Sequence, residues 1–301
     1  MGLKHRKKFI MTKNLKIVVL AKQVPDTRNV GKNAMTPEGT VNRSALPAIF
    51  NPEDMNALEQ ALRIKDSNPT AEVLLLTMGP ARAAEIIREG IFRGADGGIL
   101  LSDRKFAGSD TLATSYALSQ AIRKINPDII IAGRQAIDGD TAQVGPQVAE
   151  KLNMPQVTYA EEILEVSAEK IVIKRRLERG IEVVSSTLPL VITVHATAPD
   201  CRPRHAKQLL KYKYARTASE DGAKNSNYLL PLEDYNYLKI AEWGAEDIGG
   251  EDIQFGLSGS PTKVKKIENI VFQAKEAKKL TDSQEDIDSL IGELIANHTI
   301  G

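Results

Sequence analysis

The sequence predicts an α/β fold built on a doubly wound, mostly parallel sheet. Three observations support this fold: short apolar runs recur along the chain, turn residues bound each run, and a helical pattern follows each one. Continuous runs rich in Ile, Val and Leu suit strands that are buried on both faces of a parallel sheet. Strands that alternate with helices are joined by right-handed crossovers, which place helices on both faces of the sheet.

The predicted strands of the first half are KIVVLA (16–21), EVLLLTMG (72–79), GGILLSD (97–103) and DIIIAG (128–133). After residue 155 the pattern changes. Residues 169–196 contain strand-like stretches, with ERG (178–180) as a predicted hairpin turn and LPLVITVHA (188–196) as a buried strand. We therefore expect a hairpin to be added to the parallel sheet.

The connecting segments have helical spacing. Residues 51–66, 80–93, 109–125 and 141–152 repeat apolar side chains every three or four positions. Asn51 occupies a cap position, Pro52 the first helical position and Asp54 the first turn of the first segment. Asn51 and Ser109 could each cap a helix or contact a ligand, and for both we favour capping.

Three regions are predicted along the chain. Residues 1–14 are a basic leader that we expect to be disordered, with Met11 as an alternative start to Met1. Residues 15–215 form the α/β domain. Residues 216–301 are predicted to be a linker and an arm, with a polar stretch at 217–227, an extended stretch at 256–267 and an amphipathic helix at 282–297. We expect the arm to pack on a partner subunit; the alternative is that it folds back on its own domain.

Composition argues against several classes of function. The 40 Lys and Arg residues balance 39 Asp and Glu, so nucleic acid is not expected as a partner. Cys201 is the only cysteine, which argues against disulfides and cysteine-based metal sites and fits a reducing, cytoplasmic setting. No histidine pair has metal-ligand spacing, and no metal site is predicted. No apolar run is long enough to span a membrane.

A ligand site is expected at the carboxyl ends of the strands. The chain has no G-x-x-x-x-G-K-[ST] loop, no G-x-S-x-G elbow and no G-x-G-x-x-G after its first strand, which argues against ordinary ATPases, hydrolases and dehydrogenases. Open α/β sheets bind ligands near the switch in strand order. The loops at this edge are small or polar and could enclose a nucleotide: 21–27, 77–81, 102–110 and 132–141.

The segment GRQAIDGDTAQVGPQ (133–147) leads from a strand into a helix. The unpaired N–H groups of a helix start, together with its dipole, suit phosphate. Because Pro146 would be costly deep inside a helix, the free donors are expected at Thr141, Ala142, Gln143 and Val144. Residue chemistry alone leaves a nucleotide cradle and a plain capped helix equally open.

The charged residues around this turn have more than one interpretation. Asp138 and Asp140 would repel a phosphate, so we expect them to cap, to accept from a ribose or to meet a cation. Arg134 could contact an anionic or redox group, or form a surface ion pair. The charges of RRLER (175–179) are interpreted as those of a solvated hairpin.

The longer segment GRQAIDGDTAQVGPQVAEKLNMPQVTY (133–159) closely resembles the signature of the β subunit of electron-transfer flavoproteins. VVLAKQVPDT, NPEDMNALEQALRIKD, LTMGPARAAEIIREGIFRGAD and VVSSTLPLVITV match the same family in the same order, so the resemblance covers about residues 15–210. It implies a fold of the adenine-nucleotide-binding type. It also implies an electron-carrying subunit that is enzymatic only in a complex with a flavin-bearing α subunit and a dehydrogenase.

The resemblance also implies a cofactor. Subunits of this family hold AMP in ordinary carriers and a second FAD in electron-bifurcating members, which oxidise NADH. Carried over by motif, the implied nucleotide contacts are Ala21, Asn51, Met78, Gly133, Thr141, Gln143 and Val144. In the bifurcating case, the residues implied to lie near the flavin are Asp103, Arg104, Thr111 and Arg134.

LLSDRKFAGSDTLATSY and the tail with GLSGSPTKV resemble the bifurcating branch. We therefore expect FAD, NADH as donor, an acyl-CoA dehydrogenase or reductase as partner, and ferredoxin or flavodoxin as low-potential acceptor. The alternative is an AMP-binding carrier for acyl-CoA dehydrogenases. DCRPRHAK (200–207) departs from the family pattern Asn-x-Pro-Arg-Tyr, which leaves the dehydrogenase open. An ATP pyrophosphatase or ligase is disfavoured because AKQVPDT replaces its S-G-G-x-D-S loop.

Overall fold

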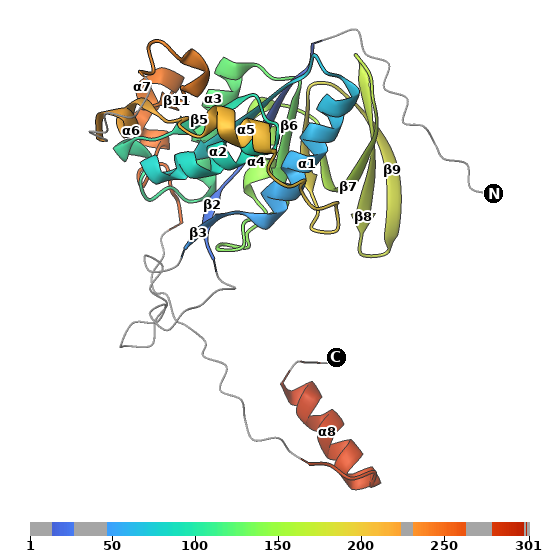
Figure 1. Ribbon diagram of the computed structural model, residues 1–301. Coiled ribbons are helices and arrows are strands. Elements are labelled where there is room, and N and C mark those ends of the chain that lie inside the picture. Colours follow the sequence, from blue (N-terminus) through green and yellow to red (C-terminus); the bar gives the residue numbers. More distant parts are fainter. Residues whose placement is uncertain (1–13, 27–46, 224–230, 263–278, 298, 300–301) are drawn as a thin grey trace, which may run out of the picture.

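The computed structural model describes residues 14–26, 47–223, 231–262, 279–297 and 299. Within these residues, nine strands form one sheet in the order β11-β5-β4-β1-β6-β10-β7-β8-β9 (Figure 1). The parallel strands are β1 (Lys16–Leu20), β4 (Glu72–Met78), β5 (Gly97–Leu101), β6 (Ile129–Gly133), β7 (Gln156–Val166), β10 (Leu190–Val194) and β11 (Ala241–Trp243). The leader predicted at 1–14 lies outside the described residues except for Asn14.

The strand order confirms the doubly wound fold. From β1 the chain moves outward through β4 and β5, then returns to place β6 on the other side of β1. The switch in strand order therefore lies between β1 and β6. A small antiparallel sheet of β2 (Gln23–Pro25) and β3 (Ala48–Phe50) follows β1 and leads into the first helix.

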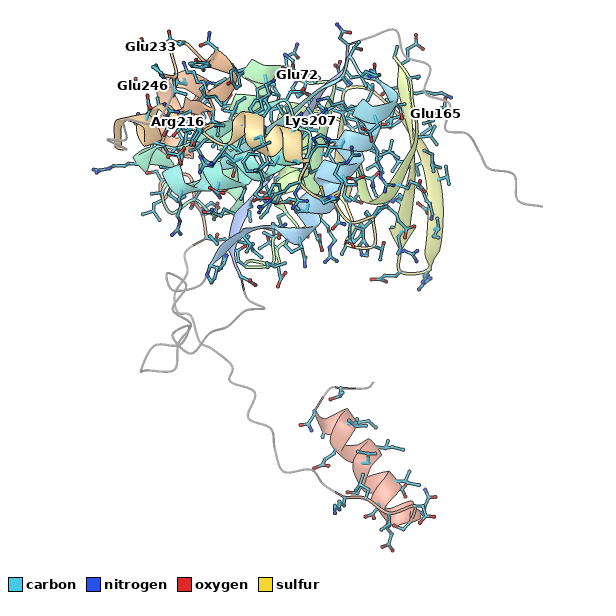
Figure 2. The ribbon with its side chains drawn as sticks, in the orientation of Figure 1. Glu72, Glu165, Lys207, Arg216, Glu233 and Glu246 are labelled. Atoms are coloured by element: carbon cyan, nitrogen blue, oxygen red, sulfur yellow. The ribbon has the colours of Figure 1, made fainter. Side chains whose placement is uncertain are left out.

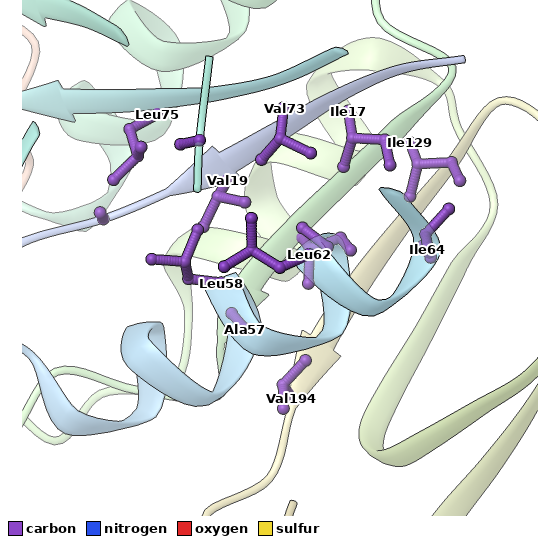
Figure 3. Close-up of a cluster of buried hydrophobic side chains, with 14 of the residues drawn as sticks. Ile17, Val19, Ala57, Leu58, Leu62, Ile64, Val73, Leu75, Ile129 and Val194 are labelled. Atoms are coloured by element: carbon purple, nitrogen blue, oxygen red, sulfur yellow. The ribbon is translucent and has the colours of Figure 1, made fainter. Parts of the chain in front are cut away.

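Four helices cover the two faces of the sheet. They are α1 (Pro52–Ser67), α2 (Ala84–Arg93), α3 (Thr111–Ile125) and α4 (Val144–Leu152). One apolar core joins α1 and α2 to the sheet, and a second core on the opposite face joins α3 and α4. Figure 3 shows Leu58 and Leu62 of α1 packed toward Ile17 and Val19 of β1. The four predicted helices are confirmed.

Two predicted caps and one predicted start need correction. Asn51 precedes α1 but makes no cap hydrogen bond. Asp110, not Ser109, caps α3, and its carboxylate accepts from the backbone N–H groups of Leu112 and Ala113. The fourth helix starts at Val144, three residues later than predicted, because Ala142 has a φ of 52° that no α-helix accommodates.

The hairpin addition is confirmed. The strands β8 (Lys170–Leu177) and β9 (Gly180–Thr187) are antiparallel and are joined at Glu178 and Arg179. The sequence pattern missed β7, whose pairings with β8 and β10 contain register shifts. Such bulges interrupt the alternation of apolar and polar residues by which a strand is recognised.

The C-terminal region differs from the predicted linker and arm. Its described elements are α6 (Ala218–Ala223), β11, α7 (Ala245–Ile248) and α8 (Gln284–Ala296), and α5 (Ala206–Tyr212) precedes them within the predicted α/β domain. Residues 231–262 fold back on the α/β domain, because Leu238, Ile240, Ile248 and Phe255 are buried in its two cores. Residues 256–259 form a turn and not an extended segment, 260–262 belong to no helix or strand, and 263–267 lie outside the described residues.

The predicted C-terminal helix is α8. None of its side chains is buried, and Figures 1 and 2 show it apart from the domain with its side chains directed into open space. Short 3₁₀ turns occur at Ala81–Ala83, Arg104–Phe106, Asn236–Leu238 and Asp252–Gln254. Across the described parts of the chain, none of the helices has both the length and the apolar character that crossing a membrane requires.

Candidate functional site

A cavity of ≈ 510 Å³ lies at the carboxyl ends of β1, β4, β5 and β6. It is beside the switch in strand order, where open α/β sheets bind ligands. All but two of the predicted site residues line it: Ala21, Met78, Asp103, Thr111, Gly133, Arg134, Thr141, Gln143 and Val144. The cavity thus brings four distant loops together. Contact of these residues with a nucleotide stays a prediction.

The other two predicted residues lie elsewhere. Arg104 is exposed and does not line the cavity. Asn51 is fully buried, and its side-chain amide holds the loop after β6: Nδ2 donates to the Gln135 carbonyl at 2.9 Å, and Oδ1 accepts from the Ile137 N–H at 3.2 Å. Asn51 therefore shapes the turn at the cavity instead of lining it.

The turn before α4 offers unpaired backbone donors. Among the described residues, the N–H groups of Thr141, Ala142, Gln143 and Val144 have no hydrogen-bond acceptor. Ala142 has a positive φ, and Gln143 has a helical conformation (φ −102°, ψ −32°). This alternation lets successive N–H groups converge on one point, as in anion-binding nests. Pro146 is the third residue of α4, where its missing N–H removes no helical hydrogen bond.

The two aspartates of this turn have other partners. Lys22 Nζ contacts the Asp138 carboxylate at 2.8 Å, so Asp138 meets a cation and does not line the cavity. Asp140 does line it, and its Oδ1 accepts from Gln135 Nε2 at 2.9 Å. Asp138 therefore meets a cation as predicted, whereas Asp140 lines the cavity with a neutral amide as the partner of one carboxylate oxygen.

Asp54, a residue that sequence reasoning assigned only to the helix start, joins two strand ends. Its carboxylate accepts from the Lys22 N–H after β1 (2.8 Å) and the Gly133 N–H of β6 (3.0 Å). Burial raises the pKa of Asp54 to about 7, although these hydrogen bonds act in the opposite direction. The signal in the sequence was an acidic residue in the first turn of a helix that follows a strand-end loop. Its partners come from tertiary structure.

Arg134 connects this cavity to a second one. Its Nη2 lies 3.1 Å from Oε1 of the buried Glu53, so the ion pair is not the surface pair considered from the sequence, and its buried Nε has no acceptor among the described residues. Arg134 also lines a neighbouring cavity of ≈ 730 Å³ at the tip of the β8–β9 hairpin. The other residues lining that cavity are Tyr159, Arg176, Leu177, Glu178, Arg179 and His195.

The RRLER segment is a partly exposed hairpin, as interpreted from the sequence, and four of its residues also line the second cavity. Tyr159 has a φ of 58°, which is strained for a bulky residue and turns its ring toward His195, with ring centroids 5.8 Å apart. Arg176 pairs with Glu161 at 2.7 Å. Hydrogen bonds from Lys174 and Arg176 lower the pKa of Glu161 to about 2. The hairpin thus contributes guanidinium groups to this cavity, and β7 and the end of β10 contribute the rings of Tyr159 and His195.

The residues present fit an adenine nucleotide in the first cavity. Apolar side chains of the sheet and α3 line part of it and suit a base: Leu20, Leu76, Leu101, Leu118 and Ala132. The free N–H groups of the turn before α4 suit a phosphate. The carboxylates at the rim have donors of their own, because Asp103 accepts from the Lys105 and Ala245 N–H groups and Asp110 caps α3.

Comparisons with known proteins identify the family. The electron transfer flavoprotein domain matches residues 38–219. "Electron transfer flavoprotein subunit beta" of Megasphaera elsdenii is 42% identical over 260 residues, 84% of this chain and 87% of that protein. "Caffeyl-CoA reductase-Etf complex subunit CarD" of Acetobacterium woodii is 44% identical over 83% of this chain and 86% of its own length. "Protein FixA" of Sinorhizobium fredii is 38% identical over 93% and 92%.

The fold and these matches define an α/β protein of electron transfer. The chain belongs to the electron transfer flavoprotein family and is a β subunit of that family. The resemblance carried by the 133–159 signature is thereby confirmed.

Proposed function

We propose that this chain is the β subunit of an electron-bifurcating flavoprotein and binds FAD across the two cavities. In this role it passes electrons from NADH to a partner dehydrogenase and to a low-potential acceptor. One observation carries the proposal: Arg134 lines both cavities, so the nucleotide-sized hollow at the strand ends adjoins a second hollow with guanidinium groups and aromatic rings. AMP would need only the first cavity.

The residues have distinct parts in this proposal. The N–H groups of 141–144 would hold phosphate, and the apolar floor would hold the adenine. Arg134, Arg176 and Arg179 would place positive charge beside the flavin ring, where reduction adds negative charge. Bound FAD would supply the hydride and one-electron chemistry. We assign no acid, base or nucleophile to the chain itself.

Partners follow from the relatives. CarD is named as a subunit of a caffeyl-CoA reductase complex. We therefore propose an acyl-CoA-type reductase or dehydrogenase, together with an α subunit, as the partners here. Ferredoxin or flavodoxin as acceptor and a cytoplasmic location rest on the sequence resemblance and composition alone, and stay predictions.

A second candidate is a carrier that binds AMP and does not bifurcate. It is favoured by the pairing of Arg134 with Glu53 and of Arg176 with Glu161, since both guanidinium groups already have carboxylate partners. In that case the second cavity would have no cofactor function.

Counting cofactors separates the two candidates. The full chain is co-expressed with its α subunit, and FAD and AMP released from the heterodimer are quantified. Bifurcation requires two FAD per heterodimer and bleaching by NADH; one FAD and one AMP would overturn it. Arg179→Gln should weaken FAD binding to the β subunit and leave AMP binding unchanged. The control Arg123→Gln removes an exposed guanidinium from α3, which lines neither cavity at this position, and should change neither.

A further inference from the structure

The loop after β5 forms one wall of the first cavity. Its lining residues are Asp103, Phe106, Ala107, Gly108, Ser109, Asp110 and Thr111. Within the loop itself, a short 3₁₀ turn and the hydrogen bonds of Asp103 and Ser109 are the internal contacts. Residues 241–262, which we call the C-terminal clamp, contact it along its whole length.

The clamp begins with backbone pairing. Its strand β11 lies parallel to β5, with Trp243 beside Leu101, and the Ser102 N–H donates to the Trp243 carbonyl at 3.0 Å. The Ala245 N–H then donates to Asp103 Oδ2 at 3.0 Å. The start of the loop is therefore fixed as an extension of the sheet.

The middle of the clamp packs closely on the loop. The ring of Phe255 is buried against Phe106 and Tyr116, with ring centroids 5.3 and 5.2 Å apart. Gly256 has a φ of +55°, and a Cβ atom there would lie 2.3 Å from the Lys105 carbonyl oxygen. Only glycine allows this approach of the two backbones.

The clamp ends on the carboxylate of Asp110. The N–H and Oγ1 of Thr262 both donate to Asp110 Oδ2, at 3.1 and 2.6 Å, and Ser260 Oγ accepts from the Asp110 N–H at 2.9 Å. The other carboxylate oxygen of Asp110 caps α3. The next residue, Thr111, donates to Gln143 Oε1 at 2.8 Å and so reaches the turn before α4.

We propose that the C-terminal clamp positions the cavity wall for nucleotide binding and that Thr262 is its positioning residue. The contacts run from Thr262 through Asp110 and Thr111 to the turn that bears the free N–H groups. Thr262 itself is exposed and does not line the cavity, so it acts only through Asp110. The inference rests on the proposed function in that the ligand is an adenine nucleotide, whether FAD or AMP.

The test is nucleotide affinity in the full chain, measured by calorimetric titration with AMP and with FAD. Thr262→Val removes the hydroxyl donor and should weaken binding about tenfold, the effect of losing one charge-assisted hydrogen bond. Thr262→Ser keeps the donor and should restore affinity. The control is Thr281→Val, because Thr281 makes the same pair of hydrogen bonds to Asp286 (2.8 and 2.6 Å) beside α8.

The outcomes are distinguishable. The proposed role of the clamp is wrong if Thr262→Val binds the nucleotide with wild-type affinity, or if Thr262→Ser weakens binding as much as Thr262→Val does. Either result leaves the proposed function unaffected. A wild-type chain that binds neither AMP nor FAD overturns both. Should Thr262→Val melt at a lower temperature than the wild type, Ser260→Ala provides the second variant, since it removes the acceptor of the Asp110 N–H.

Discussion

Asp54 is a buried residue at the first cavity, and its carboxyl group accepts hydrogen bonds from two strand ends. Its pKa of about 7 exceeds the usual 3.8. Between these values the folded chain therefore holds a proton that the unfolded chain has released. Linkage then requires the contribution of Asp54 to stability to be full below about pH 4 and to decline as the pH rises toward 7. The decline is at most about 1.4 kcal/mol per pH unit.

Asp54→Asn should abolish this decline and also destabilise the fold. An amide has one acceptor oxygen, so either Lys22 or Gly133 loses its partner, at a cost of about 1–3 kcal/mol. Urea unfolding measured from pH 4 to 8 tests both effects. Asp128→Asn is the control, because Asp128 accepts from the Lys16 N–H at the opposite end of the same strands. That variant keeps the Asp54 carboxyl, so the decline that Asp54 causes should persist in it.

Single residues differ in how far the sequence can place them. Thr141, Gln143 and Val144 were predictable because helix starts have free N–H groups wherever they occur. Asn51 has a side chain equally suited to a cap and to a loop, and its partner Gln135 is 84 positions away. Only the folded chain decides between such partners.

At the scale of elements, the site depends on how closely α1 approaches the end of β6. A Cβ atom on Gly133 would lie 2.5 Å from Asp54 Oδ1 and 2.7 Å from the backbone carbon of Glu53. The first turn of α1 can take this position only because residue 133 has no side chain. Gly133 also lines the first cavity, so a change in the packing of α1 on β6 should also change the shape of the proposed binding site.

Gly133→Ala should therefore cost about 1–3 kcal/mol of stability, as overpacking of a filled core does. It should also weaken AMP binding, since the strand end moves with the helix. Gly139→Ala serves as the matched control in the same loop, because a Cβ atom there has no neighbour within 4 Å. If both variants unfold at the wild-type urea concentration, the close packing of α1 on β6 is not what fixes this edge.

Helices and strands were predictable where a long segment repeats apolar residues at a regular spacing. α1 and α3 begin within two residues of their predicted starts, since both have many buried apolar positions. β11 has only three residues, too few for any period. It becomes a strand because β5 offers an unpaired edge, which is a tertiary effect.

At the scale of the whole molecule, α8 has no side chain that is buried against the rest of the described chain. Ile287, Leu290, Ile291 and Ile295 recur at helical spacing and are 38–53% exposed. An apolar stripe of this kind suits contact with another protein chain. The predicted arm therefore divides in two: 231–262 belongs to the domain, and α8 keeps the expectation of packing on a partner.

Ile291→Asp should lower the affinity of the chain for its α subunit about tenfold or more, because burying a carboxylate in an apolar contact is costly. The melting temperature of the isolated chain should not change, since none of the α8 side chains is buried. Pull-down titrations and thermal melts measure the two quantities. Ser289→Asp places the same charge on the opposite face of the helix and should bind normally. Loss of binding in both variants would indicate that the stripe is not the contact.

The C-terminal clamp also affects the order of events when the protein is made. The hydrogen bond between the Asp110 N–H and Ser260 cannot form until Ser260 has been synthesised, which is 150 residues after Asp110. At about 5–20 residues per second this delay is roughly 8–30 s. Until then, the loop after β5 forms its wall of the first cavity without the contacts of the C-terminal clamp. If the clamp positions the cavity wall as proposed, a nascent chain that lacks residue 260 should bind a nucleotide more weakly than the released polypeptide does.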